Sequence, residues 1–222
     1  MTTTLTRPIL LAMIAAATEQ IRGCVDELSA LDSAVGDGDH GQTMLRAMEA
    51  AQRAGAATDG DLGQVLQAVG WEVMGIDGGA TGPLLGSLFL GMAQEAAGQG
   101  QLNAARTARM IAGGASHLCS QTPARPGDKT MLDALLPAVE ALKQSAESSP
   151  DIALGMSRAA DAAAGGALAT RDMQARLGRA RHLGARTLGH ADPGATSMAM
   201  IFRGFAQALG AAEKPARSST HA

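Results

Sequence analysis

The chain has 222 residues, and 46% of them are hydrophobic, which is enough to bury a sizeable core and excludes disorder of the whole chain. Its 18 basic and 21 acidic residues give a net charge of −3, and only 2% of the residues are aromatic. These values exclude a protein that binds nucleic acid by neutralising phosphates or by stacking bases, so no nucleic-acid partner is expected.

The N-terminal part predicts neither a membrane span nor a signal peptide. The apolar run from Ile9 to Ala17 is too short to cross a membrane and is followed by Glu19 and Arg22. Cys24 and Cys119 lack the spacing of metal or redox motifs, so we interpret both as reduced thiols. We therefore expect a cytoplasmic protein with no membrane partner.

Apolar residues then recur at helical spacing along most of the chain, between segments rich in glycine and proline. The expected helices cover about 9–30, 44 to about 53, 61 to near 75, a stretch following Pro83, about 102–120, 132–142, a stretch within about 151–170, and a last one opened by Asp192. Asp61 is expected to cap the third helix. Residues 171–189 predict a shorter basic helix or a loop.

No segment alternates in the manner of a β-strand, and no linker divides the chain. The sequence therefore predicts one all-α domain of about eight helices over 1–212. Residues 213–222 form a polar segment, which predicts a disordered tail.

Glycine residues cluster with aspartate, threonine and lysine in four of the expected interhelical loops. In the first loop Asp32, Asp37 and Asp39 lie within eight residues, and carboxylates that converge in this way repel one another unless a cation lies between them. Oxygen ligands of this kind are typical of Mg²⁺. The alternative is a solvated acidic turn in which an aspartate caps a helix.

Two other interpretations of this loop fail on spacing. An EF-hand that began at Asp37 would place Gly41 and Met48 at positions that need oxygen ligands. The segment also matches G-x-G-x-x-G, but no strand precedes it, and its two carboxylates would oppose a pyrophosphate.

The remaining loops suit an anion. Residues 78–82 lead into a helix at Pro83, where unpaired amides favour a phosphate, although a packing turn is an equal alternative. The loop at Asp192 has the same design, with an ordinary N-cap as its alternative. Lys129 could contact a phosphate or lie on the surface. The arginines of 171–186 are normally a solvated face, and the residues alone do not say which one would enter a site.

Together these motifs closely resemble the L subunit, or nucleotide-binding domain, of the dihydroxyacetone kinases, in order over about residues 8–210. The matching segments are Leu31-Asp32, Gly36-Asp37-Gly38-Asp39-His40-Gly41, Gly78-Gly79-Ala80-Thr81-Gly82-Pro83, Pro126-Gly127-Asp128-Lys129-Thr130-Met131, Met173-Gln174-Ala175-Arg176 with Gly178-Arg179-Ala180, and Gly189-His190-x-Asp192-Pro193-Gly194-Ala195-Thr196-Ser197.

The resemblance implies a closed barrel of eight antiparallel helices that carries a nucleotide, ADP or ATP, in the loops at one end. It implies that Asp32, Asp37 and Asp39 hold two Mg²⁺ ions that bridge the nucleotide phosphates. The positions that it assigns to the nucleotide are His40, Gly41, Gln42, Thr43, Gly79, Ala80, Thr81, Met131, Arg179, Asp192, Pro193 and Gly194. This chain departs from the family's usual residues at Thr81, Leu85 and Thr122.

The implied function is that of a phosphoryl-transferring subunit, with no covalent catalytic residue, acting on dihydroxyacetone or a related short ketose bound by a separate K subunit. The implied donor is either ATP or a phosphotransferase-system phosphoprotein. The alternative function is a regulatory nucleotide-binding module that contacts a transcription regulator.

Overall fold

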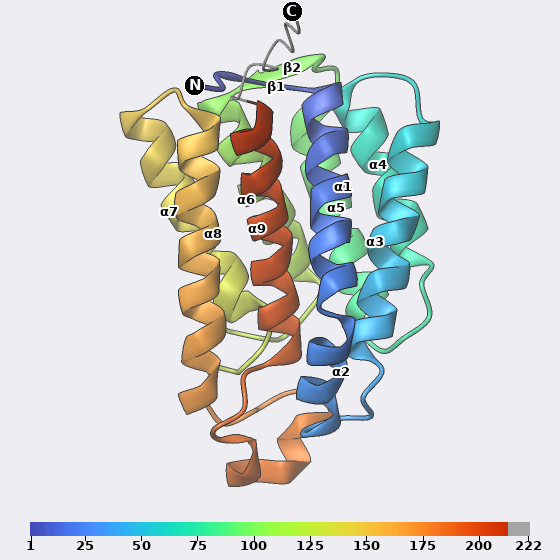
Figure 1. Cartoon of the computed structure of the whole chain (residues 1–222), viewed down its shortest axis with the longest axis vertical. Coiled ribbons are helices and arrows are strands. Elements are labelled where there is room, and N and C mark those ends of the chain that lie inside the picture. Colours follow the sequence, from blue (N-terminus) through green and yellow to red (C-terminus); the bar gives the residue numbers. More distant parts are fainter. Residues whose placement is uncertain (213–222) are drawn as a thin grey trace, which may run out of the picture.

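The computed structural model describes residues 1–212 and is helical through most of its length (Figure 1). Eight of its helices are 13 to 20 residues long. The helices are α1 (Arg7–Gly23), α2 (Val25–Ser33), α3 (His40–Ala57), α4 (Leu62–Met74), α5 (Thr81–Ala96), α6 (Ala104–Ser120), α7 (Leu132–Ser148), α8 (Ile152–Ala169) and α9 (Pro193–Ala212).

The eight long helices form a closed ring, which confirms the expected all-α barrel. Each of α3 to α8 packs against the next helix in the chain, and α9 packs against α1 and closes the ring. Apolar side chains from all eight helices fill the interior. Examples that are at most 2% exposed are Leu10, Met48, Leu66, Phe89, Met110, Leu135, Met156 and Ile201.

The single helix expected over about 9–30 is wrong, because the structure divides it into α1 and α2. The helix axis bends by 58° at Cys24, whose backbone angles of −125° and 16° are not helical. Apolar spacing continues through the break because Ile21 before it and Leu28 after it are both buried. Periodicity alone therefore could not show the bend.

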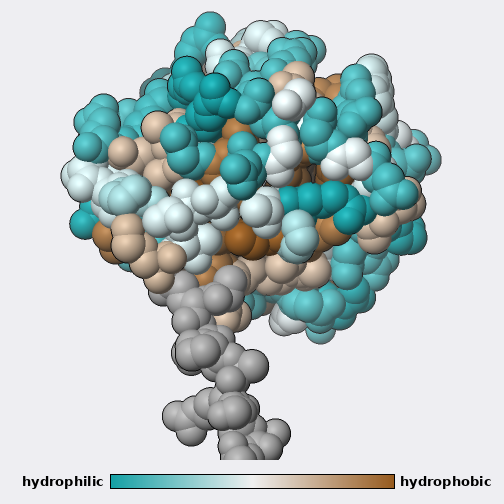
Figure 2. Space-filling model, turned by 90° about the horizontal axis from the view of Figure 1, so that it is seen from above, coloured by the Kyte–Doolittle hydropathy of each residue, from teal (hydrophilic) through white to brown (hydrophobic). Residues whose placement is uncertain are grey.

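Two short strands were also not expected. β1 (Thr4–Thr6) and β2 (Gln101–Asn103) pair antiparallel, and Leu5 lies opposite Leu102. Strands of three residues are too short for alternation to show in the sequence. They lie across the end of the ring at the top of Figure 1, and this face is mostly hydrophilic with small hydrophobic areas (Figure 2).

The connections at the other end of the ring carry the glycine clusters. Because the ring helices alternate in direction, the α2–α3, α4–α5, α6–α7 and α8–α9 connections all lie at this end (Figure 1). The last connection contains two 3-10 helices, η1 (Thr170–Asp172) and η2 (Arg179–Thr187), which fits the short helix or loop expected there.

Two expectations concern parts of the chain away from the ring. The expected tail, 213–222, lies outside the described residues. Among residues 1–212, no single helix has the length and hydropathy of a membrane span; only the bent pair α1 and α2, taken together, passes on length and composition.

Candidate functional site

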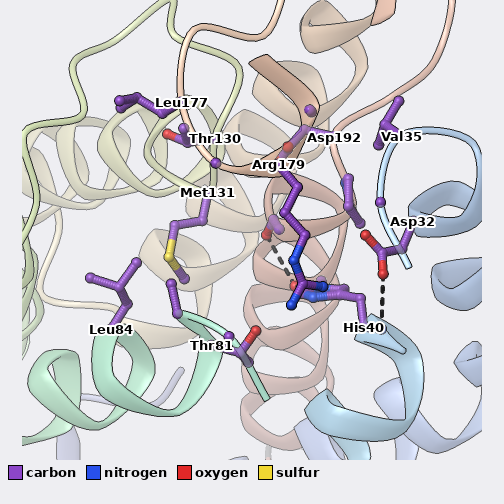
Figure 3. Close-up of a pocket in the computed structure, with 18 of the residues that line it drawn as sticks. Asp32, Val35, His40, Thr81, Leu84, Thr130, Met131, Leu177, Arg179 and Asp192 are labelled. Carbon is purple, nitrogen blue, oxygen red and sulfur yellow. Dashed lines mark hydrogen bonds between the residues drawn. The ribbon is translucent and has the colours of Figure 1, made fainter. Parts of the chain in front are cut away.

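The four glycine-rich connections surround a pocket of about 430 Å³, which Figure 3 shows in close-up. These connections lie at the lower end of the ring in Figure 1. The wall of the pocket comes from the segments 32–44, 78–84, 118–132, 177–180 and 192–197. In Figure 3, Asp32 and His40 lie on one side with Val35 beside them, and the apolar side chains of Leu84, Met131 and Leu177 lie on the other. Loops from both ends of the chain, between Asp32 and Ser197, therefore form a single site.

Three carboxylates meet on the acidic side of this pocket. One oxygen each of Asp32, Asp37 and Asp39 lies within 4.8 Å of the others. Oδ2 of Asp32 accepts hydrogen bonds from the amides of Gly38 at 2.9 Å and His40 at 3.3 Å, so this carboxylate is fixed by the loop itself. A group of oxygen donors alone, carrying three negative charges, fits a hard cation such as Mg²⁺.

The tight turn that brings the carboxylates together depends on a glycine. Gly38 has a φ of 80°, a conformation that other residues rarely adopt. A Cβ atom there would lie 2.4 Å from Oγ of Ser33. The Asp37-Gly38-Asp39 sequence thus supplies both the ligand atoms and the turn that aims them.

Arg179 is the basic group that faces these carboxylates. Its guanidinium donates to Oδ2 of Asp37, and its side chain extends across the pocket in Figure 3. Of the five arginines between 171 and 186, all in the described part of the chain, Arg179 is the one that lines the pocket. The structure thus answers a question that sequence spacing left open.

His40 lies at the start of α3, between the acidic side and α9. Its Nε2 is 3.1 Å from Oγ of Ser197, with which it shares a hydrogen bond. Burial lowers the pKa of His40, and the nearby charge of Asp32 opposes this change. The imidazole is therefore suited to hydrogen bonding more than to charge pairing at neutral pH.

Two helix starts border the pocket, and they differ in capping. α5 begins after Gly78 and Gly79, both with positive φ, and no side chain caps its first turn. Its amides are available to an anion. In contrast, Oδ2 of Asp192 accepts a hydrogen bond from the amide of Ala195 at 2.7 Å and caps α9.

The environment of Asp192 changes its acidity. Burial raises the pKa of Asp192 to about 7, while the amide of Ala195 and the charge of Lys129 act in the opposite direction. Asp192 thus serves as the N-cap that the sequence suggested, and it lines the pocket as well.

Lys129 is neither a surface lysine nor free to hold a phosphate, which corrects both interpretations of it. The residue is only 4% exposed and borders the pocket, but its ammonium donates to the backbone carbonyls of Thr170, Met173, Thr187 and His190. All four partners are more than 40 residues away in the sequence, so no local pattern could indicate them.

The apolar side of the pocket was largely missed by the sequence analysis. Met131 was expected there, and Leu84, Leu118 and Leu177 join it. Leu84 follows Thr81 by one helical turn, which is a signal that could have been used. Leu177 directly precedes Gly178 and Arg179 in the sequence, whereas Leu118 has no expected site residue beside it.

The expected nucleotide residues divide into two groups. Those that line the pocket are His40, Gly79, Ala80, Thr81, Met131, Arg179, Asp192, Pro193 and Gly194. Gly41, Gln42 and Thr43 do not line it: Gly41 packs against α2, Gln42 is exposed, and Thr43 lies buried against Gly78.

Of the positions where the chain departs from the family's usual residues, Thr81 and Thr122 line the pocket. Leu85 does not; it is fully buried in the core of the ring.

Comparison with known proteins places this geometry among phosphoryl-transfer proteins. Residues 34–207 match the family model described as the DAK2 domain. The chain is 38% identical to the "PEP-dependent dihydroxyacetone kinase, ADP-binding subunit DhaL" of Escherichia coli, over 79% of this chain and 84% of that one. It is 35% identical to the D-erythrulose kinase of Mycolicibacterium smegmatis, but there it covers only 33% of the relative.

A solved structure has the same fold. The crystal structure of the dihydroxyacetone kinase from C. freundii in complex with AMP-PNP and Mg²⁺ superimposes with a TM-score of 0.70 at 26% identity. The match covers 89% of this chain and 33% of that one. This chain thus spans about a third of the larger kinase.

Proposed function

The chain belongs to the DAK2 domain family, and on that premise we propose that it is the nucleotide-binding, phosphoryl-transferring subunit of a kinase for dihydroxyacetone or a related short ketose. One observation carries the proposal: three converging carboxylates face the uncapped start of α5 across a pocket of about 430 Å³. Such a site offers cation ligands and anion-binding amides together, as a metal–nucleotide complex requires.

Asp32, Asp37 and Asp39 would hold the metal, which we propose to be two Mg²⁺ ions. Bound there, Mg²⁺ supplies neutralisation of phosphate charge, which is the main need of phosphoryl transfer. Asp32 is held ready by the amides of Gly38 and His40. These residues therefore orient ligand atoms and take no covalent part.

The rest of the pocket suits a nucleotide, ADP or ATP. The amides at Ala80 and Thr81 would meet phosphate oxygens at the start of α5. Leu84, Met131 and Leu177 form an apolar wall of the kind that accepts the flat face of a base. We keep Gly41, Gln42 and Thr43 in the proposal as neighbours of the nucleotide site only, because none of them lines the pocket: Gly41 and Thr43 are buried, and Gln42 is exposed.

Arg179 would add positive charge where phosphate charge accumulates. Its contact with Asp37 holds the guanidinium over the acidic side of the pocket. Arginine presents a fork of donors that suits phosphate oxygens. Burial lowers the pKa of His40, so its imidazole would add a hydrogen bond to the nucleotide while staying mostly neutral.

We propose that a separate K subunit holds the ketose. Relatives that this chain matches over most of their length are named ADP-binding subunits, whereas it covers only a third of the D-erythrulose kinase. The same relatives are named PEP-dependent or PTS-dependent, which favours a phosphotransferase-system phosphoprotein as donor over exchange of ATP. ADP that stays bound during purification would support this donor, and ready loss of ADP would support ATP.

The deciding experiment is a coupled measurement of dihydroxyacetone phosphate. The chain alone, with ATP or a phosphoprotein donor, is expected to give no useful rate, because positioning the acceptor contributes about 7–11 kcal/mol to lowering such a barrier. Addition of a K subunit should start turnover, and Asp39→Asn should abolish it. Full activity of the chain alone would contradict its role as one subunit of the enzyme. The absence of turnover with every K subunit and both donors would contradict the proposed kinase activity.

A further inference from the structure

The ammonium group of Lys129 is enclosed by backbone carbonyls. Its Nζ lies 2.8 Å from the oxygen of Thr170, 3.1 Å from that of Met173, 2.7 Å from that of Thr187 and 2.6 Å from that of His190. All four distances are within or close to the normal hydrogen-bond range, and the side chain's three N–H groups are shared among four acceptors. The donating capacity of Lys129 is thus fully used by the backbone.

These carbonyls come in two pairs from the two ends of one segment. We call residues 170–190 the Arg179 segment, since Arg179 lies near its middle. The carbonyls of Thr170 and Met173 lie at its beginning, and those of Thr187 and His190 lie at its end. The single ammonium of Lys129 therefore joins both ends. The amide of Gly189 also donates to the carbonyl of Arg171 at 2.8 Å, so a backbone hydrogen bond joins the two ends as well. Residues 177–180, which line the pocket, lie between these joined ends.

A buried lysine at this place is costly for folding. Burial lowers the pKa of Lys129, which reflects the cost of removing a charge from water. The residue also has a φ of 63°, the only positive value for a residue other than glycine in 1–212. An apolar side chain of similar length would avoid the charge cost. The hydrogen bonds to the four carbonyls are therefore what the lysine adds.

We propose that Lys129 is a positioning residue: by joining the two ends of the Arg179 segment, it holds the guanidinium of Arg179 against Asp37 at the pocket. Lys129 does not touch the nucleotide in this scheme. It acts through Arg179, and the part of the proposal that concerns nucleotide affinity rests on the proposed function.

The first test needs no nucleotide. The Arg179 segment contains five exposed arginines, after which trypsin cleaves, and proteolysis of a folded protein reports how often the cleaved segment opens. Lys129→Met should raise the rate of cleavage within 171–186 by about tenfold or more, as mapped by mass spectrometry. Lys143→Met is the matched control, because it removes an exposed lysine from α7, and it should leave the pattern unchanged.

A second variant guards against misfolding. Lys129→Gln keeps an N–H donor without the charge, so its cleavage rate should lie between those of the wild type and Lys129→Met. It replaces the methionine variant if circular dichroism shows the latter to be unfolded. Wild-type cleavage in a folded variant overturns the proposal. If neither variant folds, Lys129 supports the whole ring, and a role confined to the Arg179 segment is equally overturned.

The second test asks whether Lys129 acts through Arg179. Mg-ADP is titrated by calorimetry into Lys129→Met, Arg179→Ala and the double variant. Each single change should weaken binding by about tenfold, and the double variant should be within about twofold of Arg179→Ala. Losses that multiply would contradict the positioning role. If the unchanged protein does not bind Mg-ADP, the proposed function fails, while the cleavage test still decides whether Lys129 joins the segment.

Discussion

The carboxylates of Asp32, Asp37 and Asp39 lie close enough to repel one another, so each of these residues matters individually to the site. Only Asp32 has amide donors that fix its carboxylate, while Asp37 and Asp39 are exposed on the turn. Water screens the repulsion between their charges, and a cation bound between them would turn the same closeness into shared coordination.

Replacing Asp37 or Asp39 by asparagine is expected to weaken Mg²⁺-dependent binding of ADP at least about tenfold, the lower end of what even indirect changes cost at metal sites. Helix content should not change, because both residues lie at or beside a turn. Calorimetry with Mg-ADP measures the first effect and circular dichroism the second. Asp161→Asn, on the exposed face of α8, is the control. Unaltered affinity in both variants would contradict the metal assignment.

A second prediction at this scale follows from Asp192. Burial raises its pKa from the ordinary 3.8 to about 7 in the folded protein. Between these values the folded protein keeps a proton that the unfolded chain has lost, so stability falls as pH rises from about 4 to about 7. The loss is at most about 4 kcal/mol, at 1.36 kcal/mol for each unit of pKa.

Asp192→Asn removes this loss, since an asparagine can cap α9 without titrating. The variant should be more stable than the wild type at pH 8, and the difference should shrink toward pH 5. Urea unfolding at both pH values, without metal or nucleotide, measures it. Other titrating groups are common to both proteins, so parallel profiles would show that Asp192 is not the cause.

Residues of the site differed in how far the sequence could predict them. The three aspartates were predicted because their spacing within one loop already forces them together. Lys129 was misinterpreted, because its four carbonyl partners lie 41 to 61 residues away. Leu118 and Leu177, which line the pocket, were missed as well. The chemistry of residues within one loop can be predicted from a sequence, whereas contacts between residues far apart in the sequence cannot.

At the scale of elements, the contact between α2 and α3 decides where the acidic loop lies. Gly41, in the first turn of α3, allows it: a Cβ atom there would lie 2.1 Å from the carbonyl oxygen of Val25 and 2.5 Å from Oγ of Ser29. The bend at Cys24 brings α2 into this position. Asp32 near the end of α2 and Asp39 beside α3 are thereby held at a fixed spacing.

Gly41→Ala should lower the free energy of unfolding by about 1–3 kcal/mol, because α3 must move away from the backbone of α2. It should also weaken Mg-ADP binding by separating the two carboxylates. Gly165→Ala is the control: it lies in α8 with no atom within 4 Å of the added Cβ, and should raise stability by about 0.5–1 kcal/mol. Denaturant unfolding of both variants provides the comparison, and equal effects would refute the argument.

The elements themselves were well predicted where local signals exist. Asp61 was expected to cap a helix, and it forms a capping box with Gln64 at the start of α4. The bend at Cys24 was missed although Gly23, the last residue of α1, directly precedes it. The apolar spacing continues from Ile21 to Leu28 across the break, and the packing of α2 against α3 is not contained in the sequence of α1 and α2.

At the scale of the whole molecule, the pocket lies between four connections that join eight different helices, α2 to α9. A ligand there would hold these connections together and favour the folded state by mass action. The sequence predicted eight helices from periodicity, but that α9 meets α1 and closes the ring came only from resemblance, because periodicity shows which face is buried and not against what.

Mg-ADP at a hundredfold excess over its Kd should stabilise the protein by about 2.7 kcal/mol, which raises Tm by roughly 5–10 °C in a domain of this size. EDTA should abolish the rise, because without metal the carboxylates repel the phosphates. Differential scanning calorimetry with and without EDTA tests this. An equal rise in EDTA would mean that amides and Arg179 hold the nucleotide without metal.

The closure of the ring by α1 and α9 has a mechanical consequence. α1 begins and α9 ends at the same end of the ring, opposite the connections that line the pocket (Figure 1). These helices have 17 and 20 residues, so at 1.5 Å per residue about 25 to 30 Å of rigid helix separates their outer ends from the pocket. A domain or tag fused at the outer end of α1 or α9, or a surface to which that end is attached, would therefore leave the mouth of the pocket open. In this architecture the protein can be tethered covalently while its ligand still exchanges.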